Sequence, residues 1–107
     1  MQTNRTLDGR FERRFPIVVV VRLSRPGSLA SGEEVAYTDN ISAHGARVVS
    51  SHPWRPGEQA QVAPLNEERP IRGEVVYCQS VANARFCAGF RFQEKLEWSV
   101  LERYDGA

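Results

Sequence analysis

Two short polar motifs contain the residues of this sequence that could do chemistry. The first spans residues 10–14 (RFERR) and places Arg10 and Arg14 four residues apart. The second spans residues 40–45 (NISAHG) and has the form Asn-x-Ser-x-x-Gly. Arginine forks grip phosphate oxygens two at a time and also stack on rings. Asn and Ser supply short hydrogen-bonding groups, and Gly lets a backbone approach a ligand closely. The motifs therefore favour an anionic ligand.

Positive charge is concentrated near the N-terminus. Residues 1–25 contain six arginines against two carboxylates, a balance of +4, so the other 82 residues of this +1 chain sum to −3. The only lysine is Lys95. This asymmetry supports an anionic ligand docked near the N-terminus.

The elements that position these motifs are predicted to be strands. Short apolar runs separated by turn residues predict strands at residues 17–23, 33–39, 46–50, 58–63, 71–79 and 85–92. The tail changes to a helical period, which predicts an amphipathic helix at about 93–104 that packs on the sheet. The fold class is therefore mainly β, a six-stranded antiparallel barrel with a C-terminal helix. Residues 1–16 lack apolar periodicity and form a flexible arginine-rich arm, and residues 17–107 form the barrel.

The sequence gives little support to an enzyme or a metal site. It contains no nucleophile elbow and no phosphate loop. His44 and His52 lack the paired spacing of metal ligands, so no metal is expected. If Ala82 and Asn83 form a two-residue turn, Cys78 lies opposite Cys87 as a packed, reduced pair.

The cellular location follows from what the N-terminus lacks. The longest apolar run, residues 17–21, is far shorter than the roughly 20 residues that span a bilayer. Arginine continues to Arg14, where a signal peptide would need its apolar stretch. We expect a cytoplasmic protein without membrane insertion.

In their order and their strand context, the two motifs resemble those of PilZ domains. The first lies just before the first predicted strand, and the second lies between the second and third strands. The resemblance spans nearly the whole chain and includes residues 75–77 (VVY) and the strand at 88–92 (AGFRF) that usually closes such a barrel. PilZ domains are six-stranded barrels that bind the bacterial second messenger cyclic di-GMP, so the resemblance implies a bacterial signalling protein.

The resemblance also implies a role for each motif. Arg10 and Arg14 would grip the phosphates of cyclic di-GMP, and a guanidinium would stack on a guanine. Arg13 is less suitable than this pair as the start of the motif, because the residue four positions later is Ile17. The opposite wall of the site would be formed by Asn40, Ser42 and Gly45. Secondary candidates for ligand contact are Arg13, Asp39 and Tyr77.

The expected function is that of a ligand sensor that needs no cofactor. Binding of cyclic di-GMP would order the arm and present a changed surface to an unidentified downstream protein effector. One alternative is a PilZ-like adaptor that binds a protein without ligand, which the presence of both motifs argues against. Another is a small nucleic-acid-binding barrel, which would need stacking platforms in a cationic groove. Because the chain outside the arm is net acidic, no nucleic acid is expected.

Overall fold

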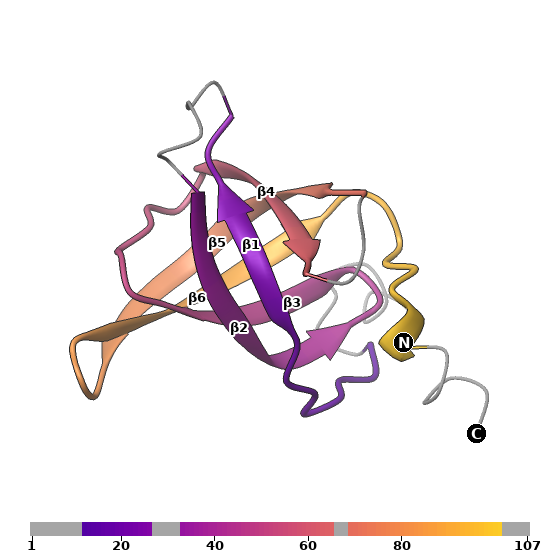
Figure 1. The fold of residues 1–107 in the computed structure, drawn as a ribbon, viewed down its shortest axis with the longest axis horizontal. Helices are drawn as coiled ribbons and strands as arrows, with labels where there is room; N and C mark the ends of the chain where they lie inside the picture. Colours follow the sequence, from indigo (N-terminus) through magenta and orange to yellow (C-terminus); the bar gives the residue numbers. More distant parts are fainter. Residues whose placement is uncertain (1–11, 27–32, 66–68, 102–107) are drawn as a thin grey trace, which may run out of the picture.

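Six antiparallel strands close into a barrel in the computed structural model, which describes residues 12–26, 33–65 and 69–101 (Figure 1). The order around the barrel is β1-β2-β3-β6-β5-β4. Each predicted strand overlaps an observed one, so the predicted six-stranded antiparallel barrel is confirmed. The strands are β1 (Val20–Ser24), β2 (Glu33–Ser42), β3 (Gly45–Ser50), β4 (Gln59–Pro64), β5 (Ile71–Val81) and β6 (Arg85–Phe92).

Alternate side chains of the strands fill the barrel. Val21 and Leu23 of β1 are fully buried, as are Val48 of β3 and Val62 of β4. This is the period-2 pattern of a sheet with one face on the core. Burying each such side chain stabilises the fold by roughly 1.5–3 kcal/mol, so the barrel is a firm scaffold for polar groups on its outside.

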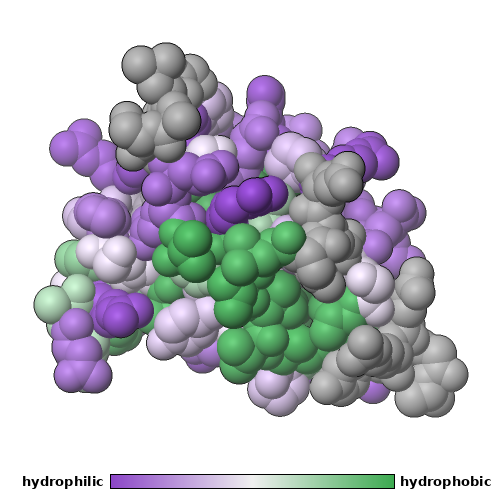
Figure 2. Space-filling model, in the orientation of Figure 1, coloured by the Kyte–Doolittle hydropathy of each residue, from purple (hydrophilic) through white to green (hydrophobic). Residues whose placement is uncertain are grey.

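The outer surface at the start of β1 and just ahead of it is apolar. Val18 and Val20 are 67% and 44% exposed, and Figure 2 shows apolar side chains gathered there on the face seen in Figure 1. The segment that leads into β1 runs past the end of β2 (Figure 1). Residues 12–14 of the first motif and the whole second motif lie at that end of β2, beyond the apolar surface.

The last residues of the predicted arm are tied to β2. The Phe15 N–H donates to the carbonyl of Ile41 at 2.8 Å, and the Ile41 N–H donates back at 2.9 Å. This bridge continues the sheet by one residue ahead of β1. Arg10 and the rest of residues 1–11 lie outside the described part of the chain, so the prediction of a flexible arm is not tested there.

Thr38 secures the chain between the arm and β1. Its side chain is fully buried, and its hydroxyl donates to the Ile17 carbonyl at 2.8 Å. The same oxygen accepts the Val19 N–H at 2.9 Å. Both polar atoms of a buried hydroxyl are thereby satisfied, which removes most of the cost of its burial. The arm consequently enters the barrel along a fixed path.

The C-terminal helix begins at Ser99, later than the predicted residue 93. Residues 93–98 are not helical, because the Leu96 N–H donates to the Ala43 carbonyl in the β2–β3 turn at 2.7 Å. This tertiary contact replaces a bond within the expected helix, although Leu96 is buried as its periodicity predicted. The end of the predicted helix lies outside the described residues. Within the described ranges, no helix is long and apolar enough to cross a membrane.

The two cysteines lie on opposite faces of the sheet, and the prediction that they pair is wrong. The β5–β6 turn contains residues 82–84, three instead of the expected two, so Gln79 stands opposite Cys87. Cys87 faces an outer hollow, whereas Cys78 packs against the core. The longer turn has a positive φ at two residues, 65° at Asn83 and 57° at Ala84. Asparagine often adopts such a φ, whereas alanine seldom does, so the sequence does not indicate the third turn residue.

Candidate functional site

A β-bulge turns the second motif toward the outside of the barrel. The register of β2 against β3 shifts by one residue between Thr38 and Asn40, so Asp39 is an extra residue. Thr38 faces the core, and strict alternation would send Asn40 and Ser42 inward as well. The bulge instead leaves Asp39 and Asn40 on the outer face and turns Ile41 into the core, where it is fully buried.

A second bulge, in β5, turns Tyr77 toward the outside of the barrel. The register of β5 against β6 shifts between Val75 and Tyr77, and Tyr77 pairs with Gly89. The Tyr77 ring lies on the Gly89 backbone so closely that a Cβ at residue 89 would be 2.2 Å from the ring carbon Cε2. Only glycine leaves room for the ring in this position.

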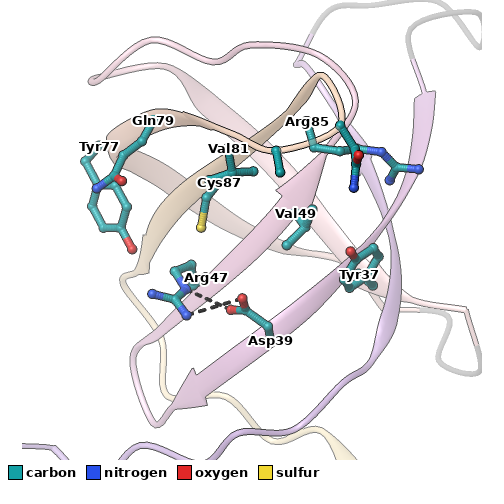
Figure 3. A pocket seen from close by; sticks show the side chains of 11 residues that line it. Tyr37, Asp39, Arg47, Val49, Tyr77, Gln79, Val81, Arg85 and Cys87 are labelled. Atoms are coloured by element: carbon teal, nitrogen blue, oxygen red, sulfur yellow. Dashed lines mark hydrogen bonds and ion pairs between the residues drawn. The ribbon is translucent and has the colours of Figure 1, made fainter.

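The strand registers align these residues in one row across the barrel wall. Asn40 on β2 pairs with Arg47 on β3. Arg47 pairs in turn with Gly89 on β6, beside Tyr77 on β5. The Arg47 Nε donates to Asp39 Oδ1 at 2.8 Å, and Figure 3 shows this ion pair at the edge of a hollow of about 460 Å³. The hollow is lined by Tyr37, Asp39, Arg47, Val49, Tyr77, Gln79, Val81, Ala82, Asn83, Arg85 and Cys87.

The electrostatics of this wall are dominated by arginine. Asp39 raises the pKa of Arg47 further through its hydrogen bond and its charge, so this cation is permanent. Burial raises the pKa of Tyr77, while the charges of Arg47 and Arg14 oppose that rise. Burial likewise raises the pKa of Cys87, which keeps its thiol protonated and poorly nucleophilic. The wall can therefore bind an anion or a polar ring, and its cysteine is a lining group.

Arg14 joins the first motif to the second. Its guanidinium Nη1 donates to Asn40 Oδ1 at 2.9 Å, across 26 residues of sequence. Arg13 lies elsewhere, with its guanidinium carbon 5.0 Å from the centre of the Phe15 ring and beside a small hollow shared with Lys95. Of these two arginines, Arg14 is therefore the one that contacts the second motif.

Glu12 provides a second link between the motifs, which the sequence analysis did not identify. The Ser42 hydroxyl and the His44 backbone N–H both donate to Glu12 Oε1, each at 3.1 Å. The His44 ring Nδ1 lies 2.5 Å from Glu12 Oε2. Burial alone would raise the pKa of Glu12, but the hydrogen bonds from His44 and Ser42 bring it below its ordinary value. The position of Glu12 inside the first motif was the only signal available.

Gly45 is required for space at this turn. A Cβ there would lie 3.1 Å from the Phe90 carbonyl oxygen and 3.4 Å from Ser42 Oγ. Its φ is not positive, so close approach of β6 is the reason for glycine.

The structure thus gathers most of the predicted site residues around one outer region. Arg47 also belongs to this region and was missed, because only the bulge at Asp39 aligns it with Asn40. Among the residues that the structure describes, no group of three or more His, Cys, Asp or Glu side chains could hold a metal ion. The predicted residues brought together are Arg14, Asp39, Asn40, Ser42, Gly45 and Tyr77, with Arg13 turned away and Arg10 outside the described chain.

Comparison with known proteins identifies the family. No curated protein matches the sequence. The fold is similar to that of the Bacillus subtilis inhibitor of motility (MotI/DgrA), with a TM-score of 0.63 and 20% sequence identity. The match covers 82% of this chain and 44% of that one, so this chain spans less than half of its neighbour. The profile of the PilZ domain family matches residues 8–104, and the chain therefore belongs to the PilZ domain family.

Proposed function

We propose that this domain binds cyclic di-GMP where the arm meets the β2–β3 turn. The observation that carries the proposal is the hydrogen bond from Arg14 to Asn40, which brings together the two motifs that PilZ domains use for this ligand. A guanidinium has five N–H donors. Only one of them is used in a hydrogen bond within the described chain, so the others remain for phosphate oxygens.

The wall beside Arg14 suits a guanine base. The Asp39 carboxylate can accept N–H groups from the edge of a guanine, and Arg47 can donate to its O6 and N7. The exposed ring of Tyr77 offers a face for stacking. A ligand with two phosphates and two guanines therefore finds complementary groups for both of its components.

Calorimetry with cyclic di-GMP tests the proposal on the wild type and Arg14→Ala. Arg72→Ala is the matched control, since it removes the same charge from an exposed position at the start of β5. We expect binding by the wild type and the control and a loss of about 100-fold in Arg14→Ala. Equal binding by wild type and Arg14→Ala would remove Arg14 from the site. No binding by the wild type would favour the adaptor that acts without ligand.

We also propose that the bound ligand passes its signal to a protein partner through the arm. The protein with the similar fold is described as an inhibitor of motility, which is a regulatory role, and we extend a regulatory role to this chain. Ligand that bridges Arg14 and the barrel wall would hold the arm more firmly than the free protein does. Amide hydrogen exchange at residues 12–15 should slow when cyclic di-GMP is added, and unchanged exchange would contradict this mechanism.

A further inference from the structure

The carboxylate of Glu12 lies at the point where the two motifs meet. We propose that Glu12 is a positioning residue that holds the arginine arm on the β2–β3 turn before the ligand arrives. This inference rests on the proposed binding of cyclic di-GMP and adds to it a role for a residue that does not touch the ligand. We call the contact of Glu12 with Ser42 and His44 the clasp.

The hydroxyl of Ser42 is committed within the protein. Ser42 is 1% exposed, and its Oγ lies 3.1 Å from Glu12 Oε1 and 3.5 Å from the Gly45 carbonyl oxygen. The nearer, charged acceptor takes its one proton. A ligand oxygen could not receive that proton while the clasp is closed. Ser42 of the second motif therefore binds the arm, and the ligand is left to Asn40 and the wall beside it.

The chain between Glu12 and Phe15 is held at both ends. Glu12 is fixed to the turn, and Phe15 is fixed to Ile41 by a pair of backbone hydrogen bonds. Side chains alternate along an extended chain. Glu12 and Arg14 accordingly both reach β2 and its turn, whereas Arg13 stacks on Phe15. With both ends held, the backbone of Arg14 is ordered before binding.

The charge of Glu12 acts against its positioning role. A carboxylate beside a phosphate-binding site repels an anionic ligand, so a purely electrostatic view predicts tighter binding when Glu12 is removed. Positioning predicts the opposite, because a ligand that must order the arm itself binds more weakly. The sign of the change in affinity therefore distinguishes the two effects.

The experiment compares Glu12→Ala with Glu12→Gln by calorimetry with cyclic di-GMP. Both variants lose the same charge, but glutamine keeps an acceptor for the Ser42 hydroxyl and the His44 N–H. Glu94→Ala, at an exposed position, measures the general effect of removing one carboxylate. We expect Glu12→Ala to bind about tenfold more weakly. Glu12→Gln should stay within about threefold of the wild type, and Glu94→Ala within about twofold. Unchanged or tighter binding by Glu12→Ala would overturn the proposal.

A second measurement needs no ligand. Amide exchange at His44 should be faster in Glu12→Ala than in the wild type, while exchange at Val48 in the buried part of β3 stays the same. Unchanged exchange at His44 would overturn the clasp, whatever the calorimetry gives. A wild type that fails to bind cyclic di-GMP would overturn the proposed function and the effect of the clasp on affinity. Faster exchange at His44 in Glu12→Ala would in that case support only the contact between Glu12 and the turn.

Discussion

Two arginines at opposite ends of β2 and β3 show how one residue type serves two purposes. Arg25, at the end away from the β2–β3 turn, donates to Glu58 at 3.0 Å and lies 4.0 Å above the Trp54 ring. Arg14, at the turn, makes one hydrogen bond in the described chain, to Asn40. Within the described residues, Arg25 makes two hydrogen bonds to the barrel and covers a ring, whereas Arg14 makes one hydrogen bond and is the residue that we propose for the ligand.

Two buried serines repeat the contrast. Ser50, at the same end as Arg25, is fully buried, and its hydroxyl donates to the Glu34 carboxylate. The Ser50 oxygen accepts the His52 backbone N–H at 3.1 Å and the Trp54 indole N–H at 3.3 Å. Ser42 is almost as buried, but its nearest partner is the Glu12 carboxylate of the arm at 3.1 Å, with the Gly45 carbonyl oxygen farther away at 3.5 Å. The two serines therefore differ less in burial than in the position of their carboxylate partner, which lies on β2 for Ser50 and ahead of β1 for Ser42.

Replacing each of the two arginines by alanine gives the largest expected effect. Arg14→Ala should weaken cyclic di-GMP binding by about 100-fold, which is about 2.7 kcal/mol, and leave the free energy of unfolding nearly unchanged. Arg25→Ala should leave the affinity unchanged and lower the free energy of unfolding by about 1 kcal/mol, because it removes an ion pair and a stacked cation. Calorimetry and urea unfolding measure the two quantities. An equal loss of affinity in both variants would break the comparison.

The serines give the next largest effect. Ser50→Ala should lower the free energy of unfolding by about 2 kcal/mol, since it leaves the Trp54 indole N–H and the Glu34 carboxylate without their shared partner. Ser42→Ala should lower it by less and should weaken cyclic di-GMP binding several-fold through the clasp. Urea unfolding of both variants, followed by calorimetry, tests this division. A loss of affinity in Ser50→Ala larger than in Ser42→Ala would contradict it.

Gly89 tests the wall of the site with a smaller effect. Gly89→Ala places a methyl group against the Tyr77 ring, which should cost about 1 kcal/mol of stability and move the ring away from the guanine position. In a Tyr77→Ala background the same alanine should be nearly harmless, because the ring that it meets is gone. A double-mutant cycle by urea unfolding and calorimetry measures this coupling. Equal costs in the two backgrounds would mean that the ring does not lie on Gly89.

The difference between barrel and site also explains what the sequence could predict. The strands were predictable because their apolar residues alternate over several positions, and each strand needs only its own pattern. The orientation of Asn40 was not predictable, because it depends on one extra residue at Asp39 whose effect appears only in the pairing with β3. Glu12 was not predictable for a related reason, since its partners lie 30 or more residues away.

Lowering the pH gives the smallest expected effect, and it acts on one carboxylate at each end of the barrel, Glu12 and Glu58. Hydrogen bonds from His44 and Ser42 lower the pKa of Glu12 despite its burial, and the hydrogen bond from Arg25 lowers the pKa of Glu58. A carboxylate with a lowered pKa stabilises its contact fully above its ordinary pKa, near 4.5, and loses that contribution as the pH falls through the lowered value. The contacts of Glu12 and of Glu58 should therefore both lose stability as the pH falls from about 4.5 through the lowered pKa values.

Only the clasp should respond to Glu12→Gln. An NMR titration of the wild type should show the His44 amide signal shifting below about pH 4.5 as Glu12 is protonated. Arg13 and Lys95 line the hollow beside Glu12. Their positive charges favour the ionised carboxylate, so they do not reverse the lowering of the Glu12 pKa. In Glu12→Gln the shift at His44 should vanish, while signals around Glu58 should still move. A His44 shift that persists in Glu12→Gln would remove the Glu12 carboxylate from control of the turn.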